Sequence, residues 1–350
     1  MKIKHISHFN RVSVLKSFCS MPNCDEFSMC ELVNSKGMQM KVMSYGATLT
    51  SLKVPLKNGN LVDVVLGFET LEEYIKSYDL PSAPYFGAIV GRFAGRISNG
   101  EFKLGGKSYL INKNNNGNSL HGGSIGLSQR NWKIKSKKEG KNPSVTFAYC
   151  SKHNEEFFPG DVVVDVTYML TDENEMIVEY VAHASQDTIL NLTHHSYFNL
   201  DGHHNSVVDQ EMCVNSQRIL ETTSSGIPTG RFLNVANCPF DFTNSRNCPA
   251  TIDTTFVLNK EKEYAASLYS SDKLLKMSVY TNQRAVHVYV GGNCFGQING
   301  KDNAAYHPTS GICFETQNFP DAPNHDHFPS AILKKGELYY HKTIYKFKSF

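Results

Sequence analysis

Two polar and aromatic segments of this chain contain the residue types that acid–base chemistry requires. His195 lies within Asn191 to Leu200 (NLTHHSYFNL), and Glu315 lies within Gly311 to His325 (GICFETQNFPDAPNH). An imidazole that titrates near neutral pH can donate a proton, and a carboxylate can accept one. The sequence therefore predicts an enzyme that uses general acid–base catalysis. The alternative is that His195 is a hydrogen-bonded structural residue and that Glu315 is a solvated charge at a strand end.

The fourteen histidines raise the question of a metal site. His194 and His195 are adjacent on an expected strand, so their side chains point to opposite faces and cannot bind one ion together. His203 and His204 have the same difficulty if they are extended. The chain has neither a His-x-x-x-His pair on a helix nor a Gly-rich phosphate loop after a strand. We therefore expect no metal ion and no nucleotide cofactor.

Composition indicates an ordinary globular protein and limits its partners. The 350 residues are 40% hydrophobic and 19% charged, with a formal net charge of +2 and scattered basic residues. No apolar run reaches the roughly 18 residues that span a bilayer. We expect neither a nucleic acid partner nor membrane insertion. The expected partner is an uncharged polar small molecule, and the expected assembly is a monomer or a weak homodimer.

The cysteines favour a reducing compartment. They are odd in number, widely spaced and without any Cys-x-x-Cys pair, which argues against a disulfide framework and a structural zinc site. The only glycosylation sequon, Asn191-Leu192-Thr193, lies inside an expected active-site segment. We therefore expect a cytoplasmic protein. Residues 1–24 contain basic but no acidic residues, and we expect a flexible extension there, with a weak transit peptide as the alternative.

Most of the chain carries the patterns of β-strands. Phe102 to Leu110 predicts a hairpin on a Gly-Gly turn, and Val162 to Leu170 returns through a polar turn into Met176 to Ala184. One short helix is expected to begin at Thr70, because Thr70 and Glu73 have the spacing of a capping box. Further alternating or β-branched runs occur at Met38–Val54, Val62–Phe68, Val145–Tyr149, Ala285–Val290 and Glu337–Phe347.

Strands without long intervening helices exclude a doubly wound α/β fold. No linker rich in Pro, Gly or Ser divides the chain, and no repeat occurs. The sequence therefore predicts an all-β fold, a large antiparallel β-sandwich with a few short helices, formed by one domain over residues 25–350.

Five motifs, taken together, resemble the galactose mutarotase (aldose 1-epimerase) family in order and spacing. The resemblance covers most of residues 35–348 and implies a mutarotase-like supersandwich with a sugar cleft on one face. It also implies interconversion of the α and β anomers of free hexoses such as galactose and glucose, without a cofactor. The motifs are PYFGAIVGRFAGRI (84–97), NSLHGG (118–123), FPGDVVVDVTYML (158–170), NLTHHSYFNL (191–200) and ETQNFPDAPNH (315–325).

The resemblance assigns roles at matching positions. His195 corresponds to the general acid that protonates the ring oxygen, and Glu315 to the general base that takes the proton from the C1 hydroxyl. Arg96 and His121 resemble residues that hold sugar hydroxyls or the ring oxygen. Asp253 resembles the carboxylate that binds the distal hydroxyls. The alternatives are a surface ion pair for Arg96 and a cap on a glycine turn for His121.

Four positions depart from the family pattern. Gly95 and His194 stand where asparagine is common, Thr254 stands where histidine is usual, and His287 stands where glutamine is typical. These changes are expected to surround substrate-holding positions, so His287 is a candidate substrate-binding residue that adds pH dependence. Tyr197 is a further candidate, with core packing as its alternative.

The sequence is also compatible with two other functions. An epimerase of a phosphorylated hexose would need clustered cations for the phosphate, and only Arg92 and Arg96 are available. A sugar sensor of the same fold would need no acid opposite a base, so the presence of both His195 and Glu315 argues against a non-catalytic protein.

Overall fold

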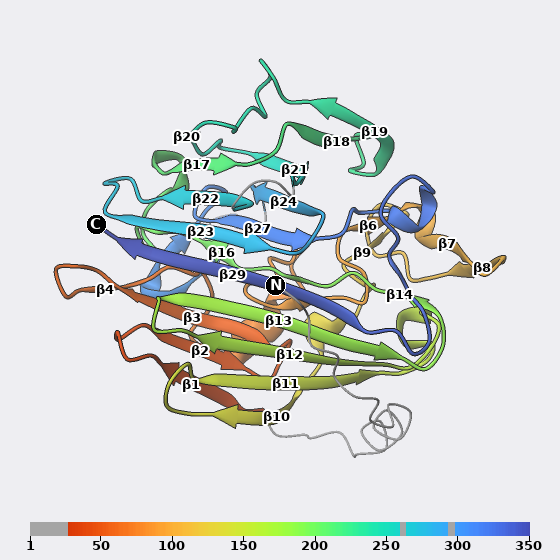
Figure 1. Ribbon diagram of the computed structural model, residues 1–350, viewed down its shortest axis with the longest axis horizontal. Coiled ribbons are helices and arrows are strands. Elements are labelled where there is room, and N and C mark those ends of the chain that lie inside the picture. Colours follow the sequence, from red (N-terminus) through yellow and green to blue (C-terminus); the bar gives the residue numbers. More distant parts are fainter. Residues whose placement is uncertain (1–26, 260–263, 293–297) are drawn as a thin grey trace, which may run out of the picture.

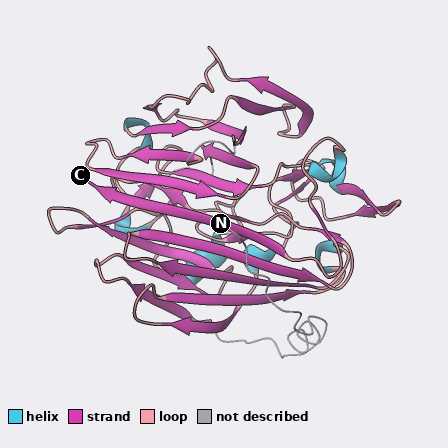
Figure 2. Cartoon of the chain, viewed as in Figure 1, coloured by secondary structure: helices cyan, strands magenta, loops and turns pink. Residues whose placement is uncertain are grey.

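The computed structural model describes residues 27–259, 264–292 and 298–350, and strands dominate this part of the chain (Figures 1 and 2). The expected extension over residues 1–24 lies outside the described residues. Three larger sheets and several two-stranded pairs are present, and every pair within the larger sheets is antiparallel. The expected all-β sandwich with few short helices is confirmed.

A nine-stranded sheet crosses the whole molecule, from β20 at the top of Figure 1 to β10 at the bottom. Its strands, in spatial order, are β10 (Lys133–Lys138), β11 (Ser144–Ser151), β12 (Val162–Leu170), β13 (Glu175–Ala184), β29 (Tyr339–Ser349), β23 (Leu275–Thr281), β22 (Ala266–Tyr269), β17 (Glu211–Val214) and β20 (Arg246–Asn247). The predicted return of β12 into β13 is confirmed, with Val162 paired to Ala184.

A six-stranded sheet and a four-stranded sheet lie behind it. The six-stranded sheet has the order β16 (Tyr197–Phe198), β27 (Ile312–Gln317), β24 (Ala285–Val290), β21 (Ile252–Val257), β18 (Arg218–Thr222) and β19 (Pro228–Asn234). The four-stranded sheet consists of β1 (Met29–Val33), β2 (Gln39–Met43), β3 (Thr48–Pro55) and β4 (Leu61–Asp63). The two-stranded pairs are β5 (Ile89–Val90) with β15 (Thr193–His194), β6 (Arg96–Ile97) with β9 (Ser119–Leu120), β7 (Glu101–Leu104) with β8 (Lys107–Leu110), β14 (Thr188–Ile189) with β28 (Ile332–Leu333) and β25 (Ile298–Asn299) with β26 (Ala305–Tyr306).

The main core lies between the nine-stranded sheet and the sheets behind it. Val164 and Val166 of β12 belong to the same buried cluster as Val286 and Val288 of β24 and Phe314 of β27. Because side chains alternate along a strand, one face of β24 and β27 packs into this core and the other face is turned away from it. Each fully buried aliphatic or aromatic side chain contributes about 1.5–3 kcal/mol relative to exposure. The outward face of the six-stranded sheet is thereby left for polar side chains.

The predicted helix is α2 (Leu71–Ser77), and its capping box is present. The Thr70 hydroxyl accepts from the Glu73 amide, and the Glu73 carboxylate accepts from the Thr70 amide. The chain beyond the helix, at Tyr78 and residues 80–83, lines the cavity described below. Six short 3-10 helices also occur among the described residues.

The structure differs from the sequence prediction at three places. The run Met38–Val54 is divided into β2 and β3 by a turn at Ser44–Ala47, where Gly46 has a left-handed φ of 65°. The run Val62–Phe68 is a strand only as far as Asp63, because Val64 and Leu66 instead bond to loop and strand partners far along the chain. Cys150 is disulfide-bonded, whereas the cysteine spacing had argued against a disulfide framework. No helix in the described ranges is long and apolar enough to cross a membrane.

Candidate active site

Three neighbouring strands of the six-stranded sheet form the floor of the site. Thr255 on β21 pairs in register with His287 on β24, and His287 pairs with Glu315 on β27. Asp253 lies two residues before Thr255 and therefore projects from the same face. These side chains point away from the core into a cavity of about 490 Å³. Long-range strand pairing thus collects three of the predicted site residues.

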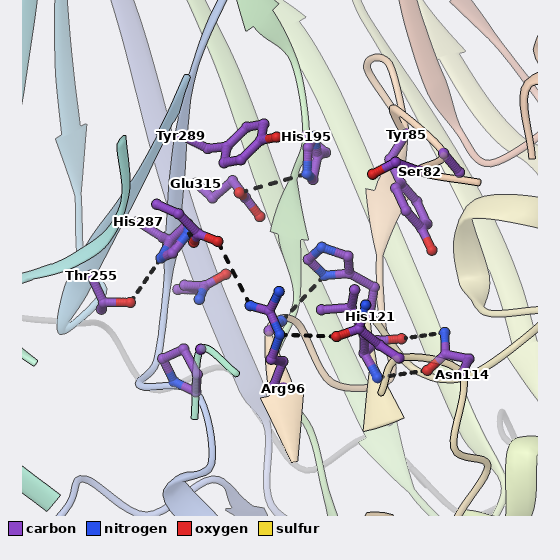
Figure 3. A pocket seen from close by; sticks show the side chains of 18 of the residues that line it. Ser82, Tyr85, Arg96, Asn114, His121, His195, Thr255, His287, Tyr289 and Glu315 are labelled. Atoms are coloured by element: carbon purple, nitrogen blue, oxygen red, sulfur yellow. Dashed lines mark hydrogen bonds and ion pairs between the residues drawn. The ribbon is translucent and has the colours of Figure 1, made fainter. Parts of the chain in front are cut away.

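The other wall is formed by the short β-pairs. The His195 amide donates to Ala88 O, and the Gly87 amide donates to His195 O, so the motif from Pro84 to Ile97 fixes the backbone of His195. Arg96 on β6 pairs with Leu120 on β9, which places Arg96 beside His121. All predicted site residues except Tyr197 line the same cavity. Figure 3 shows five of them turned toward one another: Arg96, His121, His195, His287 and Glu315.

His195 and Glu315 are the buried pair of this cavity. Their side chains are 4% and 3% exposed, and His195 Nε2 lies 3.6 Å from Glu315 Oε1 (Figure 3). That separation is longer than a hydrogen bond, so neither group is fully satisfied by the other. A donor and an acceptor are therefore held side by side, facing the same space, as proton transfer at two nearby oxygens requires.

Asp253 stands at the more open side of the cavity between two cationic groups. Its Oδ1 lies 2.8 Å from His287 Nε2, and its Oδ2 lies 3.9 Å from Arg96 Nη1. The other ring nitrogen of His287, Nδ1, lies 2.8 Å from Thr255 Oγ1. Partial burial favours a higher pKa for Asp253, but the hydrogen bond and charge of His287 outweigh it and hold this pKa well below its ordinary value.

The contact between Asp253 and His287 also shifts the pKa of His287, in the opposite direction. Burial acts to lower the pKa of His287, but the hydrogen bond and charge of Asp253 outweigh burial and raise this pKa. His287 and Asp253 therefore favour the charged state of each other.

His121 is held in one protonation state by its surroundings. The Gly95 amide donates to His121 Nδ1 at 3.3 Å, which leaves the ring proton on Nε2. Burial and the charges of His195 and Arg96 keep the pKa of His121 well below its ordinary value. A neutral imidazole that carries its proton on Nε2 is a hydrogen-bond donor suited to a sugar oxygen.

His121, His195 and Glu315 are also the residues best placed to hold a metal ion. Their ligand atoms lie within 4.8 Å of one another, and two histidines with one carboxylate form a known ligand set. The Gly95 bond to Nδ1 opposes this use, because a protonated Nε2 cannot ligate a metal. The donor set therefore fits a hydroxylated ligand better than an ion.

Tyr197 does not line the cavity, which corrects its expected role in substrate binding. Its side chain is buried, and its ring packs against Phe86 and Tyr289 at centroid distances of 5.1 and 6.1 Å. The ring also lies 5.4 Å from that of His195. Tyr197 therefore supports the imidazole from below the cavity.

Two of the four departures from the family pattern lie outside the site. His194 is buried in the core against Tyr168 and Tyr345, and burial lowers its pKa to about 3. Thr254 lies on the face of β21 opposite to Asp253. Gly95 and His287 do line the cavity. The expectation that all four surround the substrate is therefore wrong for His194 and Thr254.

Several residues that were not predicted also line the cavity, and four of them lie beside the predicted residues. Thr255, Tyr289 and Gln317 each lie two residues after a predicted site residue on the same strand, so strand alternation was the signal that could have found them. Tyr85 gave no such signal. Its ring contacts both His121 and His195, at centroid distances of 5.0 and 5.7 Å, and burial raises its pKa to about 12.

Comparison with known proteins identifies similar chains over nearly the whole length. A sequence model of the aldose 1-epimerase family matches residues 28–346. Galactose mutarotase of Sus scrofa is 38% identical over 326 residues, which cover 90% of this chain and 92% of that protein. Aldose 1-epimerase of Escherichia coli (strain K12) is 30% identical over 343 residues, which cover 93% of this chain and 96% of that protein.

Solved structures agree with the observed architecture. An aldose epimerase homologue from C. elegans superimposes with a TM-score of 0.85 at 30% identity, covering 93% of this chain and 99% of that chain. A galactose 1-epimerase from Lactobacillus acidophilus has a TM-score of 0.80 at 24% identity, with the same coverage of both chains, and supports the fold alone.

Proposed function

This chain belongs to the aldose 1-epimerase family, and from that premise we propose that its cavity interconverts the α and β anomers of free hexoses such as galactose and glucose. The observation that carries this proposal is the pairing of His195 and Glu315. Both are buried, their reactive atoms are 3.6 Å apart, and they face a cavity lined by polar groups.

Opening a cyclic hemiacetal needs proton transfers at two oxygens on the same carbon. Glu315 takes the proton from the C1 hydroxyl while His195 donates a proton to the ring oxygen, and the C1–O5 bond breaks. Rotation about the C1–C2 bond then presents the other face of the aldehyde. The same pair acts in reverse, with His195 as base and Glu315 as acid, and the ring closes as the other anomer. No electron is transferred, and both residues return to their starting states.

The remaining polar side chains of the cavity orient the sugar relative to His195 and Glu315. His121 presents a neutral imidazole whose proton is on Nε2, and Arg96 presents a fixed cation whose Nε donates to Asn115 Oδ1 at 3.2 Å. Asp253 offers an ionised carboxylate for hydroxyl donors, and His287 holds it in place. Pre-positioning of this kind lowers the entropic part of the barrier.

A phosphorylated hexose is a weaker fit for this cavity. Arg92, one of the two cations available for a phosphate, is 2% exposed, and its guanidinium donates to Ser151 and to the carbonyls of Lys152 and Pro159. Among the described residues, Arg96 is the only lysine or arginine that lines the cavity. A single cation already shared with Asp253 does not make a phosphate site.

Polarimetry tests the acid–base assignment. Freshly dissolved α-galactose and α-glucose are followed with the unmodified protein, with Glu315→Gln and with His195→Asn. Each substitution is expected to lower kcat by about 10²- to 10⁴-fold, the usual contribution of one general acid or base. Glu179→Gln is the matched control, since Glu179 lies on β13 of the other large sheet and pairs with Lys342.

The outcomes separate the enzyme from a sensor. Equal rates with and without the unmodified protein, together with sugar binding in calorimetry, would leave a non-catalytic binding protein of the same fold. Acceleration that survives both substitutions would instead move the acid–base role to other residues of the cavity.

We also propose that the protein acts in the cytoplasm and that residues 25–350 form one domain. Most described cysteines form no disulfide, which supports a reducing compartment, although Cys150 is disulfide-bonded; those without a disulfide are Cys30, Cys213, Cys238, Cys248 and Cys313. One buried cluster that runs from Cys30 to Phe347 supports a single domain. Subcellular fractionation tests the location, and a single unfolding transition seen by two independent probes tests the domain assignment.

A further inference from the structure

We propose that the side-chain amide of Gln317 is a further substrate-binding group, which pairs with one ring hydroxyl of the sugar other than the anomeric one. This inference rests on the proposed mutarotase function, because it assumes a free aldose whose C1 hydroxyl meets Glu315. The position of Gln317, its missing hydrogen bond and the shape of its surroundings carry the argument.

Gln317 projects into the cavity from the same strand face as the proposed base. It lies on β27 two residues beyond Glu315, and it lines the cavity with Glu315. Its partner in register on β24 is Ala285, whose methyl group leaves space beside the longer side chain. Side chains two residues apart on a strand are separated by about 7 Å along it. A sugar whose anomeric end meets Glu315 therefore extends along the strand toward Gln317.

The side-chain oxygen of Gln317 is buried without a hydrogen-bond partner. The residue is 1% exposed, and its Oε1 has no hydrogen-bond partner among the described residues. Leaving a buried polar atom unpaired costs about 1–3 kcal/mol. His287 on the neighbouring strand, in contrast, bonds both Thr255 and Asp253. A ligand hydroxyl at Gln317 would supply the missing partner.

Gly95 lies beside the amide of Gln317. This residue has a φ of +79°, and a Cβ added to it would lie 3.0 Å from Pro320 and 3.5 Å from Gln317 Nε2. A side chain at residue 95 would therefore crowd Pro320 and contact the amide nitrogen, and glycine avoids both contacts. Rotation about the terminal torsion, which is soft, exchanges Oε1 and Nε2. A sugar hydroxyl donates and accepts, so it can pair with either end.

A double-mutant cycle between protein and substrate tests this assignment. Gln317→Met retains the length of the side chain and removes the amide. Galactose and a series of analogues, each lacking one ring hydroxyl, are compared for kcat/KM by polarimetry and for Kd by calorimetry. The variant should lose about tenfold in affinity for galactose, the effect of one hydrogen bond. For one analogue, the variant and the unmodified protein should bind equally.

The contradicting result is a loss of the same size for galactose and for every analogue. Such uniform loss means that Gln317 acts through the structure of the cavity and not by contact with a hydroxyl. Gln283→Met, at a half-buried position between β23 and β24 that does not line the cavity, is the matched control and should change no value.

Calorimetry in the Glu315→Gln background separates this inference from the proposed function. The unmodified protein could show no turnover while Gln317 still couples to one specific hydroxyl. That result would support the binding role of Gln317 and overturn the mutarotase activity. Turnover by the unmodified protein without any coupling overturns the role of Gln317 alone.

Discussion

His287 is the residue through which pH acts most directly on this site. Its ring is bonded to Thr255 on the neighbouring strand and to Asp253 on that same strand. Glu315 faces it from the strand on the other side. The charged or titratable groups that face it from the opposite wall are Arg96 and His121. Asp253 dominates this environment, because it is the charge in direct contact with the ring.

We expect the contact between His287 and Asp253 to make stability depend on pH. A pKa raised above its ordinary value of 6.5 means that the stabilisation is fully present below about pH 6.5. It is lost as pH rises through the raised value, because the folded state then releases its extra proton. The lowered pKa of Asp253 limits the same stabilisation at the acid end, below its ordinary value of 3.8. Urea unfolding from about pH 6 to 9 should show a larger decline for the unmodified protein than for His287→Gln.

Loss of the proton from His287 should also alter sugar binding. Because the imidazolium holds Asp253 in position, KM for galactose should rise as His287 loses its proton, and His287→Gln should give the flatter profile. A flat profile for the unmodified protein between about pH 5.5 and 8 would show that His287 has no such influence.

At the scale of elements, a buried ion pair joins the 3-10 helix η5 (Lys301–Asn303) to the four-stranded sheet. Lys301 Nζ donates to Thr50 O at 2.7 Å and to Asp63 Oδ2 at 2.8 Å. Burial favours a higher pKa for Asp63, but the nearby His203 imidazole, 3.8 Å away, and the charge and hydrogen bond of Lys301 hold this pKa well below its ordinary value. The carboxylate is therefore ionised inside the protein and depends on its partners.

Lys301→Met should lower the free energy of unfolding by about 3–5 kcal/mol, because it leaves the buried charge of Asp63 without its cation. Urea unfolding at neutral pH measures this loss. The double variant Lys301→Met with Asp63→Leu should be more stable than Lys301→Met alone, since it removes the unpaired charge. Lys57→Met, at an exposed position between β3 and β4, is the control. A loss no larger than that of Lys57→Met would mean that the pair contributes nothing.

At the scale of the whole molecule, the lower edge of the nine-stranded sheet is protected against pairing with another chain. Its edge strand β10 has the sequence KIKSKK and is mostly exposed, and its register with β11 is broken by a bulge at Ile134–Ser136. Lysines and bulges on an edge strand oppose the addition of a further strand. Because this edge strand opposes pairing with another chain, we expect the protein to be a monomer.

Size-exclusion chromatography with light scattering should therefore give a mass near 39.2 kDa. Replacement of Lys135, Lys137 and Lys138 by threonine should increase the fraction of higher-mass species, because the charges that repel a second edge are removed. A stable dimer of the unmodified protein that is unaffected by these replacements would place its interface elsewhere.

The sequence by itself determined the local elements and the chemistry. Strands β12 and β24, the hairpin of β7 with β8 and the capping box of α2 all follow from contacts between near neighbours, which periodicity and turn residues encode. The family resemblance also selected His195, Glu315 and four further residues that line one cavity.

Only the tertiary structure decided which side chains share that cavity. Tyr197 and Arg92 have types suited to binding, yet neither lines the cavity, whereas Gln317 and Thr255 were not predicted and do line it. The physical reason is that strand alternation leaves two possible faces, and only closure of the sandwich decides which face is packed into the core. The row of Thr255, His287 and Glu315 joins residues far apart in sequence, so its register is fixed by long-range pairing that no local pattern contains.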